Sequence, residues 1–504
     1  MHANWQNITD PIFHWAEQRP DAPAFIQPPE TLSYRALAGL IAKAAVYLEG
    51  GGVRSGDRVA LHLTNAIDHF ILLLALLRLG ATTMEIPYSA QQPPTPELLA
   101  KFGIKWIFIE AAAAPVAGVS SIKIDASWRS MIARRSGDRR ASDNGNGIFT
   151  ITLTSGTSGQ PKGSLASHRQ HLQRFGTHLE LLADSALFSE QPPNFLLIGP
   201  IAYAMFLPSL LNQLFAGAPL TILPTYLDTI DLVKAIGAWD GAHCRVTSAF
   251  CRYFLSCAPK QGVLFPHLRA LGTGGGFLYP EEKLAILDRV TPNFYEVYGA
   301  SGFGAMTVLT PREMRTHPQS VGRPASFVTV EVVDQAGRKL PSGTVGLLRC
   351  RGTEGKGFTA EVASDSDEHF RDGWYYPGDL ACLDQDGFVY LKGRSGTEVI
   401  SRDGIELFAA EIEAVIAQHA SVAEVAIVGV PRAVAGEELV ALVVPRGQAQ
   451  HEALAQHCVS RLPVERRPDT VYYANALPKT GAGKLDRASV KAIVMDQVRR
   501  RIGS

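Results

Sequence analysis

Glycines, hydroxyl side chains and one lysine gather in a single segment of the chain, Thr154 to Ser164, which reads TSGTSGQPKGS. Glycine lets the backbone approach a ligand closely, hydroxyl and backbone N–H groups donate hydrogen bonds, and a lysine adds a fixed cation. Together these groups suit a polyphosphate. The residues expected to contact it are Thr154, Ser155, Gly156, Thr157, Ser158, Gly159 and Lys162.

Two common motifs do not fit this segment. Its spacing is not GxxxxGK[ST], which excludes the P-loop of nucleoside triphosphatases. Gly159 directly follows Ser158, so the segment is not the GxSxG turn that exposes a nucleophilic serine. A plain Gly/Ser turn is the structural alternative, and the lysine within the cluster favours phosphate binding over it.

The segment closely resembles the phosphate-binding loop of the adenylate-forming superfamily, which contains acyl-CoA synthetases, peptide-synthetase adenylation domains and beetle luciferase. Other motifs of that superfamily follow in its order along nearly the whole chain. The resemblance implies a two-step reaction. A carboxylate attacks the α-phosphate of ATP to give an acyl-adenylate and pyrophosphate, and a thiol then captures the acyl group. It also implies ATP, Mg²⁺ and coenzyme A, or a phosphopantetheine arm, as cofactors.

Two glycine-containing segments, GTGGGF (272–277) and YGASG (298–302), look like the superfamily's adenine-binding segments. A run of glycines lets the main chain lie flat against a planar base, and the Tyr298 ring offers a face for stacking. The residues that the resemblance assigns to the adenine are Gly274, Gly275, Gly276, Tyr298, Gly299 and Ser301.

The carboxyl-terminal third carries three further matches. Asp379 falls at the superfamily's ribose aspartate, where a carboxylate can accept hydrogen bonds from both ribose hydroxyls, and Arg394 at an arginine that contacts ribose or phosphate oxygens. Lys484, in LPKTGAGKLDR (477–487), matches the catalytic lysine, a cation for the α-phosphate and the attacking carboxylate. Lys479 is expected to be an exposed charge. Glu398 falls nearest the hinge position, in a segment with one extra residue.

One departure from the pattern concerns the metal. Members of the superfamily usually have a Mg²⁺-binding glutamate where this chain has Gly302, so the sequence names no metal ligand. Mg²⁺ keeps several waters and substrate phosphates as ligands, so one lost carboxylate weakens its binding without abolishing it. Glu296, six residues upstream, is expected to be solvated or paired with another residue.

The acid-binding segment corresponds to GPIAYAMFLP (199–208). Amino-acid-activating relatives place an aspartate there, whereas this chain has Tyr203 and no acidic residue nearby, which disfavours an amino-acid substrate. The run is more similar to that of aryl-CoA ligases, so an apolar aryl or fatty acid is expected, with a slight preference for an aromatic acid. The expected pocket walls are Tyr203, Phe250, Gly276, Phe303 and Gly304.

Composition and charge narrow the class of protein. The 504 residues hold 48 Lys plus Arg and 48 Asp plus Glu, a balance that argues against a nucleic-acid-binding surface. The longest apolar run, Phe70 to Leu77, is shorter than the roughly 20 residues that span a bilayer. The amino terminus lacks a secretory signal and the six cysteines form no CxxC pair, so a cytoplasmic protein is expected.

Alternating strand and helix patterns predict an α/β fold. A helix over 34–48, a strand over 59–63 and a core helix over 67–79 begin this alternation. We expect a large amino-terminal region, 1–393, with parallel-rich sheets and a β-rich subdomain from about residue 326. A small mobile α+β domain, 394–504, should carry Lys484.

The predicted function is ATP-dependent activation of an apolar carboxylic acid, followed by transfer to a thiol, with coenzyme A preferred. The close alternative acceptor is the phosphopantetheine arm of an acyl carrier protein. An adenylate-binding protein with weakened chemistry is the alternative from another class, suggested by Gly302. Luciferase-like oxygen chemistry has no distinguishing residue in this chain.

Overall fold

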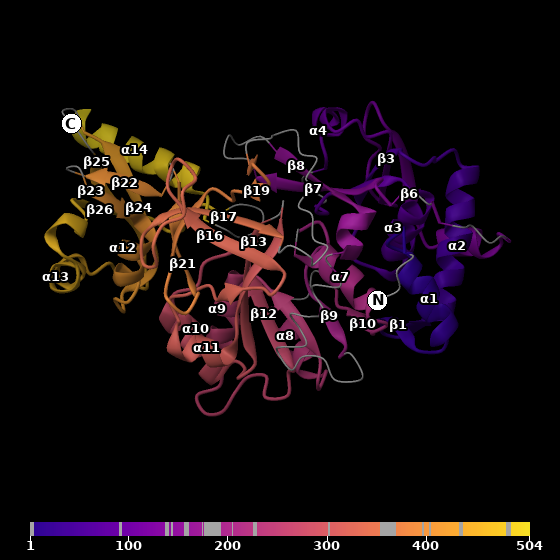
Figure 1. Ribbon diagram of the computed structural model, residues 1–504, viewed down its shortest axis with the longest axis horizontal. Helices are drawn as coiled ribbons and strands as arrows, with labels where there is room; N and C mark the ends of the chain where they lie inside the picture. The colour runs from indigo at the N-terminus through magenta and orange to yellow at the C-terminus, as the bar shows by residue number, and fades with distance from the viewer. Residues whose placement is uncertain are drawn as a thin grey trace. The chain divides into compact units, whose positions relative to one another are not determined.

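The structure is a computed structural model that describes most of the chain. Backbone is described for residues 5–89, 93–136, 141–142, 145–155, 161–173, 175, 193–203, 205–224, 229–300, 303–352, 369–395, 398–402, 405–432, 437–479 and 485–503. Side chains are described for the same residues except 154, 155, 161, 162, 229 and 501–503. The chain divides into two compact units, 1–318 with 324–329 and 351–368, and 319–323 with 330–350 and 369–504. Figure 1 follows the elements along the chain by colour.

The first unit contains a sheet with the strand order β6-β5-β3-β4-β7-β8. All neighbours are parallel except β7 and β8, which form an antiparallel pair. The strands are β3 (Arg58–His62), β4 (Thr82–Glu85), β5 (Trp106–Glu110), β6 (Ser120–Ile124), β7 (Ile148–Ser155) and β8 (Pro161–Ser167).

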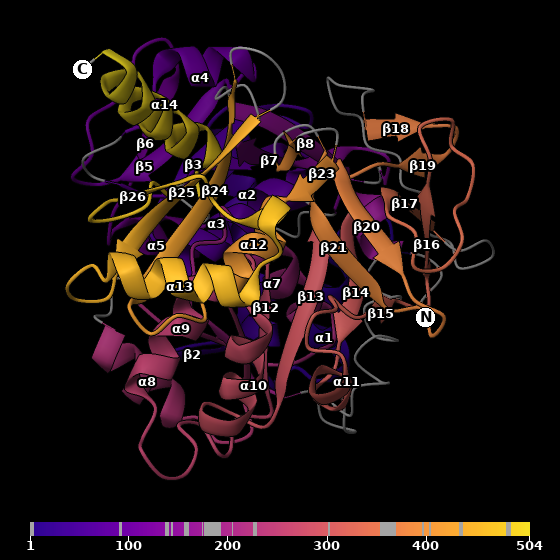
Figure 2. The ribbon, with the colours of Figure 1, turned by 90° about the vertical axis from the view of Figure 1, so that its left-hand side faces the viewer.

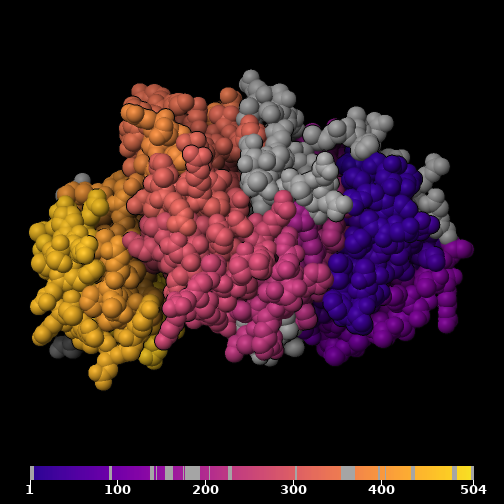
Figure 3. All heavy atoms as spheres, turned by 90° about the horizontal axis from the view of Figure 1, so that it is seen from below, coloured from indigo at the N-terminus to yellow at the C-terminus, as the bar shows by residue number. Residues whose placement is uncertain are grey.

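A second sheet of this unit runs in the order β14-β13-β12-β11-β9-β10-β1-β2. Its strands are β1 (Pro23–Gln27), β2 (Glu30–Ser33), β9 (Phe195–Leu197), β10 (Leu220–Ile222), β11 (His243–Val246), β12 (Ala270–Gly274), β13 (Phe294–Ala300) and β14 (Gly304–Leu309). The pairing of Phe25 in β1 with Leu220 in β10 joins distant parts of the sequence. In the space-filling view, the indigo amino-terminal part of the chain adjoins a magenta part from further along it (Figure 3).

Helix α3 (Ile67–Leu79) forms the centre of the first unit, with every residue except Asp68 buried. A helix that is apolar all round must be covered on all sides, and its core cluster includes side chains of β1, β3, β9 and β10 from both sheets. The remaining helices are α1 (Asp10–Gln18), α2 (Tyr34–Gly50), α4 (Pro96–Lys101), α5 (Trp128–Ala133), α7 (Phe206–Phe215), α8 (Thr229–Gly237), α9 (Ser248–Cys257), α10 (Pro280–Arg289) and α11 (Pro311–Thr316).

The chain passes between the units at β15 (Arg323–Pro324), β16 (Val328–Val333) and β17 (Gly346–Gly352). The second unit begins with an antiparallel sheet in the order β18-β19-β17-β20-β21, with β16 beside β17. Its other strands are β18 (Phe370–Arg371), β19 (Trp374–Tyr375), β20 (Asp379–Leu383) and β21 (Val389–Arg394). Asp384 accepts hydrogen bonds from the N–H groups of Asp386 and Phe388, which closes the turn between β20 and β21.

The end of the second unit is an α+β assembly. A hairpin of β22 (Val399–Arg402) and β23 (Ile405–Phe408) precedes a sheet in the order β24-β25-β26, formed by 422–431, 437–445 and 470–473. One face of this sheet packs against α12 (Ala409–Ile416) and α13 (His451–Arg461), visible in Figure 2, and the other against α14 (Arg487–Gly503). A short 3₁₀ helix, Val464–Arg466, follows α13.

The structure agrees with the predicted class and with most predicted elements. The core helix over 67–79 is confirmed at both ends, and the strand predicted over 59–63 is observed over 58–62. All six cysteines are free, and four of them are buried. No helix in the described part of the chain is long and apolar enough to cross a membrane. The predicted boundary at residues 393 and 394 stays a prediction, because the two units are distinguished by compactness and not by movement.

Acid should weaken the fold through His168, which follows β8 and is 1% exposed. Burial lowers its pKa from 6.5 to about 4, so the folded state favours the neutral ring. The neutral ring contributes up to about 3 kcal/mol to the free energy of unfolding. This contribution is present above the unfolded-state pKa of 6.5 and is lost as the pH falls toward the folded-state pKa of about 4. The free energy of unfolding, measured with urea at pH 7 and pH 4.5, should therefore change less with pH in His168→Asn than in the unaltered protein. The exposed His267→Asn variant is the control, and equal pH dependence in both variants would contradict this origin.

Candidate functional site

The predicted adenine and acid-pocket residues follow neighbouring parallel strands. Strands β9, β11, β12 and β13 are all parallel, so their carboxyl ends lie at one edge of the second sheet. Ligands of open α/β sheets bind at such edges. The residues brought to this edge are Tyr203 after β9, Phe250 in α9 after β11, Gly274 to Gly276 at the end of β12, and Tyr298 and Gly299 in β13.

The glycine run at the end of β12 has a local structural reason. A Cβ on Gly274 would lie 2.6 Å from the carbonyl oxygen of Val297 in β13. Gly275 has a φ of +73°, a left-handed conformation that side chains disfavour. Sheet packing and turn geometry therefore both require glycine here, and the same features leave bare main chain at the predicted adenine position.

The second adenine segment forms the β13–β14 hairpin. The half-buried Tyr298 pairs with Thr307, and a register shift separates it from Gly299, which pairs with Ala305. Phe303 is 1% exposed, whereas a Cβ on Gly304 would meet open space. Ser301 and Gly302 lie outside the described residues.

The predicted phosphate loop connects β7 and β8. Thr154 pairs with Lys162 and Ser155 with Pro161, so the antiparallel strands bring the two ends of the loop together. Gly156, Thr157, Ser158 and Gly159 lie outside the described residues, as do the side chains of Thr154, Ser155 and Lys162. Gly163 serves packing, because a Cβ there would lie 2.6 Å from the ring of Phe102.

The acid-pocket candidates have different surroundings. Tyr203 is half-buried and packs against the core cluster around α3. Burial raises the pKa of its phenol. The Phe250 ring lies 6.3 Å from that of Phe254, measured between centroids. Tyr203 and Phe250 follow strands that end at the same edge of the sheet, which is compatible with the predicted pocket. The pocket itself remains a prediction.

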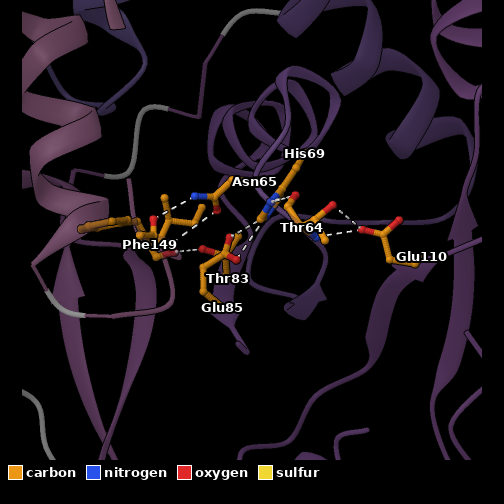
Figure 4. A network of polar contacts seen from close by, with 9 residues as sticks. Thr64, Asn65, His69, Thr83, Glu85, Glu110 and Phe149 are labelled. Atoms are coloured by element: carbon orange, nitrogen blue, oxygen red, sulfur yellow. Dashed lines mark hydrogen bonds and ion pairs between the residues drawn. The ribbon is translucent and has the colours of Figure 1, made fainter. Parts of the chain in front are cut away.

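A buried polar network that the sequence did not predict supports the segment leading to Tyr203 (Figure 4). The Asn65 amide donates to the carbonyl of Gly199 at 2.8 Å and its oxygen accepts from the N–H of Ile201 at 3.5 Å. Four residues after Asn65, His69 Nε2 lies 3.1 Å from a carboxylate oxygen of Glu85.

The sequence signal for this network is the position of its polar residues relative to the predicted strands. Glu85 ends β4 and Asn65 lies three residues after the end of the parallel strand β3, just before the apolar helix α3. Polar side chains at that edge are expected to hold a ligand or a loop, and here the described contacts hold a loop.

In the second unit, the two predicted ribose contacts are cross-strand neighbours. Asp379 in β20 pairs with Arg394 in β21, and Arg394 Nε lies 3.2 Å from Asp379 Oδ1. The aspartate is 14% exposed and the arginine 51%. Because a carboxylate has two acceptor oxygens, Asp379 can hold the arginine and still accept hydrogen bonds from a ligand.

Lys484 lies outside the described residues, but the residues that flank its segment are placed. Lys479 and Leu485 form an antiparallel bridge, and the N–H of Asp486 donates to the carbonyl of Pro478. Lys479 is partly exposed and pairs with Glu424 at 2.6 Å. The predicted hinge residue Glu398 accepts from the N–H of Arg394 and pairs with Arg487 at 3.2 Å.

Glu296, six residues before Gly302, has a partner of its own. It is buried and pairs with Lys283 at 2.5 Å, which is the structural alternative expected from the sequence. Among the described residues, no group of three or more His, Cys, Asp or Glu side chains could hold a metal ion.

Comparison with known proteins identifies the family. The model of AMP-binding enzymes matches residues 12–355, and that of the AMP-binding enzyme C-terminal domain matches residues 411–484. The chain belongs to the family of AMP-binding enzymes. This confirms the resemblance drawn from the motifs.

Relatives of this AMP-binding enzyme align over almost its full length. Indoleacetate–CoA ligase of Aromatoleum aromaticum is 27% identical over 97% of this chain and 98% of its own. The fatty acid–[acyl-carrier-protein] ligase ScoC of Streptomyces coeruleorubidus is 26% identical over 97% of each chain. The long-chain-fatty-acid–CoA ligase of Salmonella typhimurium is 24% identical, over 97% of this chain and 94% of its own. The predicted class, an AMP-forming acid–thiol ligase, is thus confirmed at the level of the family.

Solved structures share the fold. ATP-bound MatB from Rhodopseudomonas palustris has a TM-score of 0.84 at 22% identity, over 97% of this chain and 98% of that chain. O-succinylbenzoate coenzyme A synthetase from Bacillus subtilis, in complex with ATP and magnesium ion, has a TM-score of 0.81 at 19% identity, over 95% and 99%. The predicted α/β class is therefore confirmed.

Replacing Asn65 with Ala should impair use of the acid substrate. The change leaves the buried carbonyl of Gly199 without its donor, which costs roughly 1–3 kcal/mol and loosens the segment that carries Tyr203. We expect kcat/KM for the acid to fall about tenfold while the KM for ATP changes little. Thr64→Ala is the matched control, because that hydroxyl donates to Glu110 instead. Equal losses for acid and ATP would contradict this role.

Proposed function

We propose that this AMP-binding enzyme activates an apolar aryl or fatty carboxylic acid as acyl-AMP, with release of pyrophosphate, and then transfers the acyl group to the thiol of coenzyme A. The observation that carries the proposal is the parallel pairing of β9, β11, β12 and β13, whose carboxyl ends share one edge of the sheet and carry or precede both predicted adenine segments and the acid-pocket candidates. A small-molecule acid as partner and a cytoplasmic location belong to the same proposal.

The chemistry needs cations, because two anions must meet. The carboxylate and the α-phosphate repel each other until positive groups offset their charge in the transition state. Lys162, near the amino-terminal end of β8, would hold the β- and γ-phosphates, and Lys484 would reach the α-phosphate and the attacking carboxylate. The Asp379 and Arg394 pair would receive the ribose. Mg²⁺, when bound, would neutralise phosphate charge, with substrate phosphates and water among its ligands.

The nature of the acid rests on the pocket candidates. Burial raises the pKa of Tyr203, which keeps its phenol neutral, and the segment carries no carboxylate for a substrate ammonium. Apolar acids are therefore favoured over amino acids. Relatives named for indoleacetate and for long-chain fatty acids support both an aryl and a fatty substrate.

The direct test is pyrophosphate release with ATP, Mg²⁺ and a panel of aryl, fatty and amino acids. Release with an apolar acid, and none with amino acids, is expected. Release confined to amino acids would overturn the assignment of the acid. The acceptor is tested by offering coenzyme A or a phosphopantetheinylated carrier protein to the preformed adenylate, since a relative named as an acyl-carrier-protein ligase makes the carrier the second candidate.

Gly302 keeps a second function open, an adenylate-binding protein with weakened chemistry. ATP binding without pyrophosphate release for any acid would favour it. Pyrophosphate release gained by Gly302→Glu would then identify the missing metal ligand as the cause. Release by the unchanged protein at an ordinary rate would exclude this alternative.

Lys484→Ala should block the first half-reaction selectively. Loss of one charge partner of the transition state is expected to slow pyrophosphate release by about 100- to 1,000-fold. Thioester formation from supplied acyl-adenylate should largely survive. Rapid-quench measurement of each half-reaction separates the two, and an equal fall in both would refute the role given to this lysine.

A further inference from the structure

A polar cluster within the second unit joins the segment that follows Arg394 to the segment that follows Lys484. The Arg487 guanidinium donates to Glu413 through both terminal nitrogens, at 2.6 and 2.9 Å. Its third nitrogen, Nε, donates to Glu398 Oε1 at 3.2 Å. One planar cation therefore holds two carboxylates that lie 89 and 74 residues before it in the sequence.

Each member of the cluster is fixed by further contacts. Glu413 is 6% exposed and its Oε1 also accepts from the N–H of Ile427 at 2.7 Å, which ties the pair to α12 and β24. The other oxygen of Glu398 accepts from the N–H of Arg394 at 3.2 Å. The carbonyl of Glu398 accepts from the N–H of Ala409, at the start of α12.

Two members of the cluster lie close in sequence to predicted site residues. Glu398 is four residues after Arg394, which pairs with Asp379, and Arg487 is three residues after Lys484. Arg487 also begins α14, directly after Asp486, whose N–H is held by the carbonyl of Pro478. The arginine thus fixes the carboxyl-terminal side of the lysine segment to the turn that follows Arg394.

We propose that Arg487 is a positioning residue, which couples the Glu398 turn to the segment of Lys484 and so sets the lysine for the first half-reaction. The inference rests on the proposed function. A charged fork that makes three hydrogen bonds to carboxylates defines direction as well as distance, which a single lysine contact cannot do. Glu398 is therefore the partner of this coupling, in addition to its predicted place at the hinge.

Two mild variants test the coupling without emptying the buried site. In Glu398→Gln, the new amide nitrogen faces a donor whichever way it turns, either Arg487 or the N–H of Arg394, so one of the two bonds is lost. Arg487→Lys keeps a cation for Glu413 but lacks the fork that reaches Glu398. Lys479→Gln is the matched control, because it breaks an exposed ion pair on the other flank of the same segment.

Hydrogen exchange provides a measurement that needs no acid substrate. The amides of Asp486 and Val490, which donate to Pro478 and Asp486, should exchange faster in both test variants and at the original rate in the control. Pyrophosphate release should fall about tenfold in the test variants, with thioester formation from supplied acyl-adenylate unchanged.

Unchanged exchange and unchanged pyrophosphate release would overturn the proposal, and so would an equal loss in both half-reactions. Failure of the proposed function is distinguishable, because it would appear as absent pyrophosphate release in the unaltered protein while the exchange measurement still reports on the cluster.

Discussion

The parallel pairing of β9, β11, β12 and β13 is the constraint on which the candidate site depends. Each strand alone carries only a short polar or glycine-rich end. Parallel register places all four strand ends at one edge, so the segments of Tyr203, Phe250, the glycine run and Tyr298 follow or form one edge of the sheet although they are distant in sequence. The helices of the first unit stabilise this arrangement, above all α3, whose apolar surface is covered by both sheets.

Charge is handled differently in the interior and in the candidate site. Buried carboxylates in the described residues have partners, as Glu296 has Lys283, Glu85 has His69 and Glu413 has Arg487. Such pairs are costly to break because the remaining charge is left in a poorly solvated place. By contrast, Arg394 is half exposed beside Asp379, where a ligand can reach it. This difference separates structural ion pairs from a pair suited to binding.

The sequence was sufficient where a signal was local. The apolar run of α3 predicted its bounds, and the motif residues predicted the family, because both depend on residues close together in the chain. It could not predict contacts that depend on register or on distant segments. The register shift between Leu380 and Ala381 decides that Asp379 faces Arg394, and Arg487 meets Glu398 across 89 residues. Asn65 was missed for the same reason, since its partner Gly199 follows a strand of the other sheet.

The proposed function requires the nucleotide to bind at the carboxyl edge of the second sheet. A crystal structure with a non-hydrolysable acyl-adenylate analogue would locate it. The base should lie against Gly274 to Gly276 and the ring of Tyr298, with the acyl group toward Tyr203. An analogue bound elsewhere in the first unit, with this edge empty, would refute this binding site.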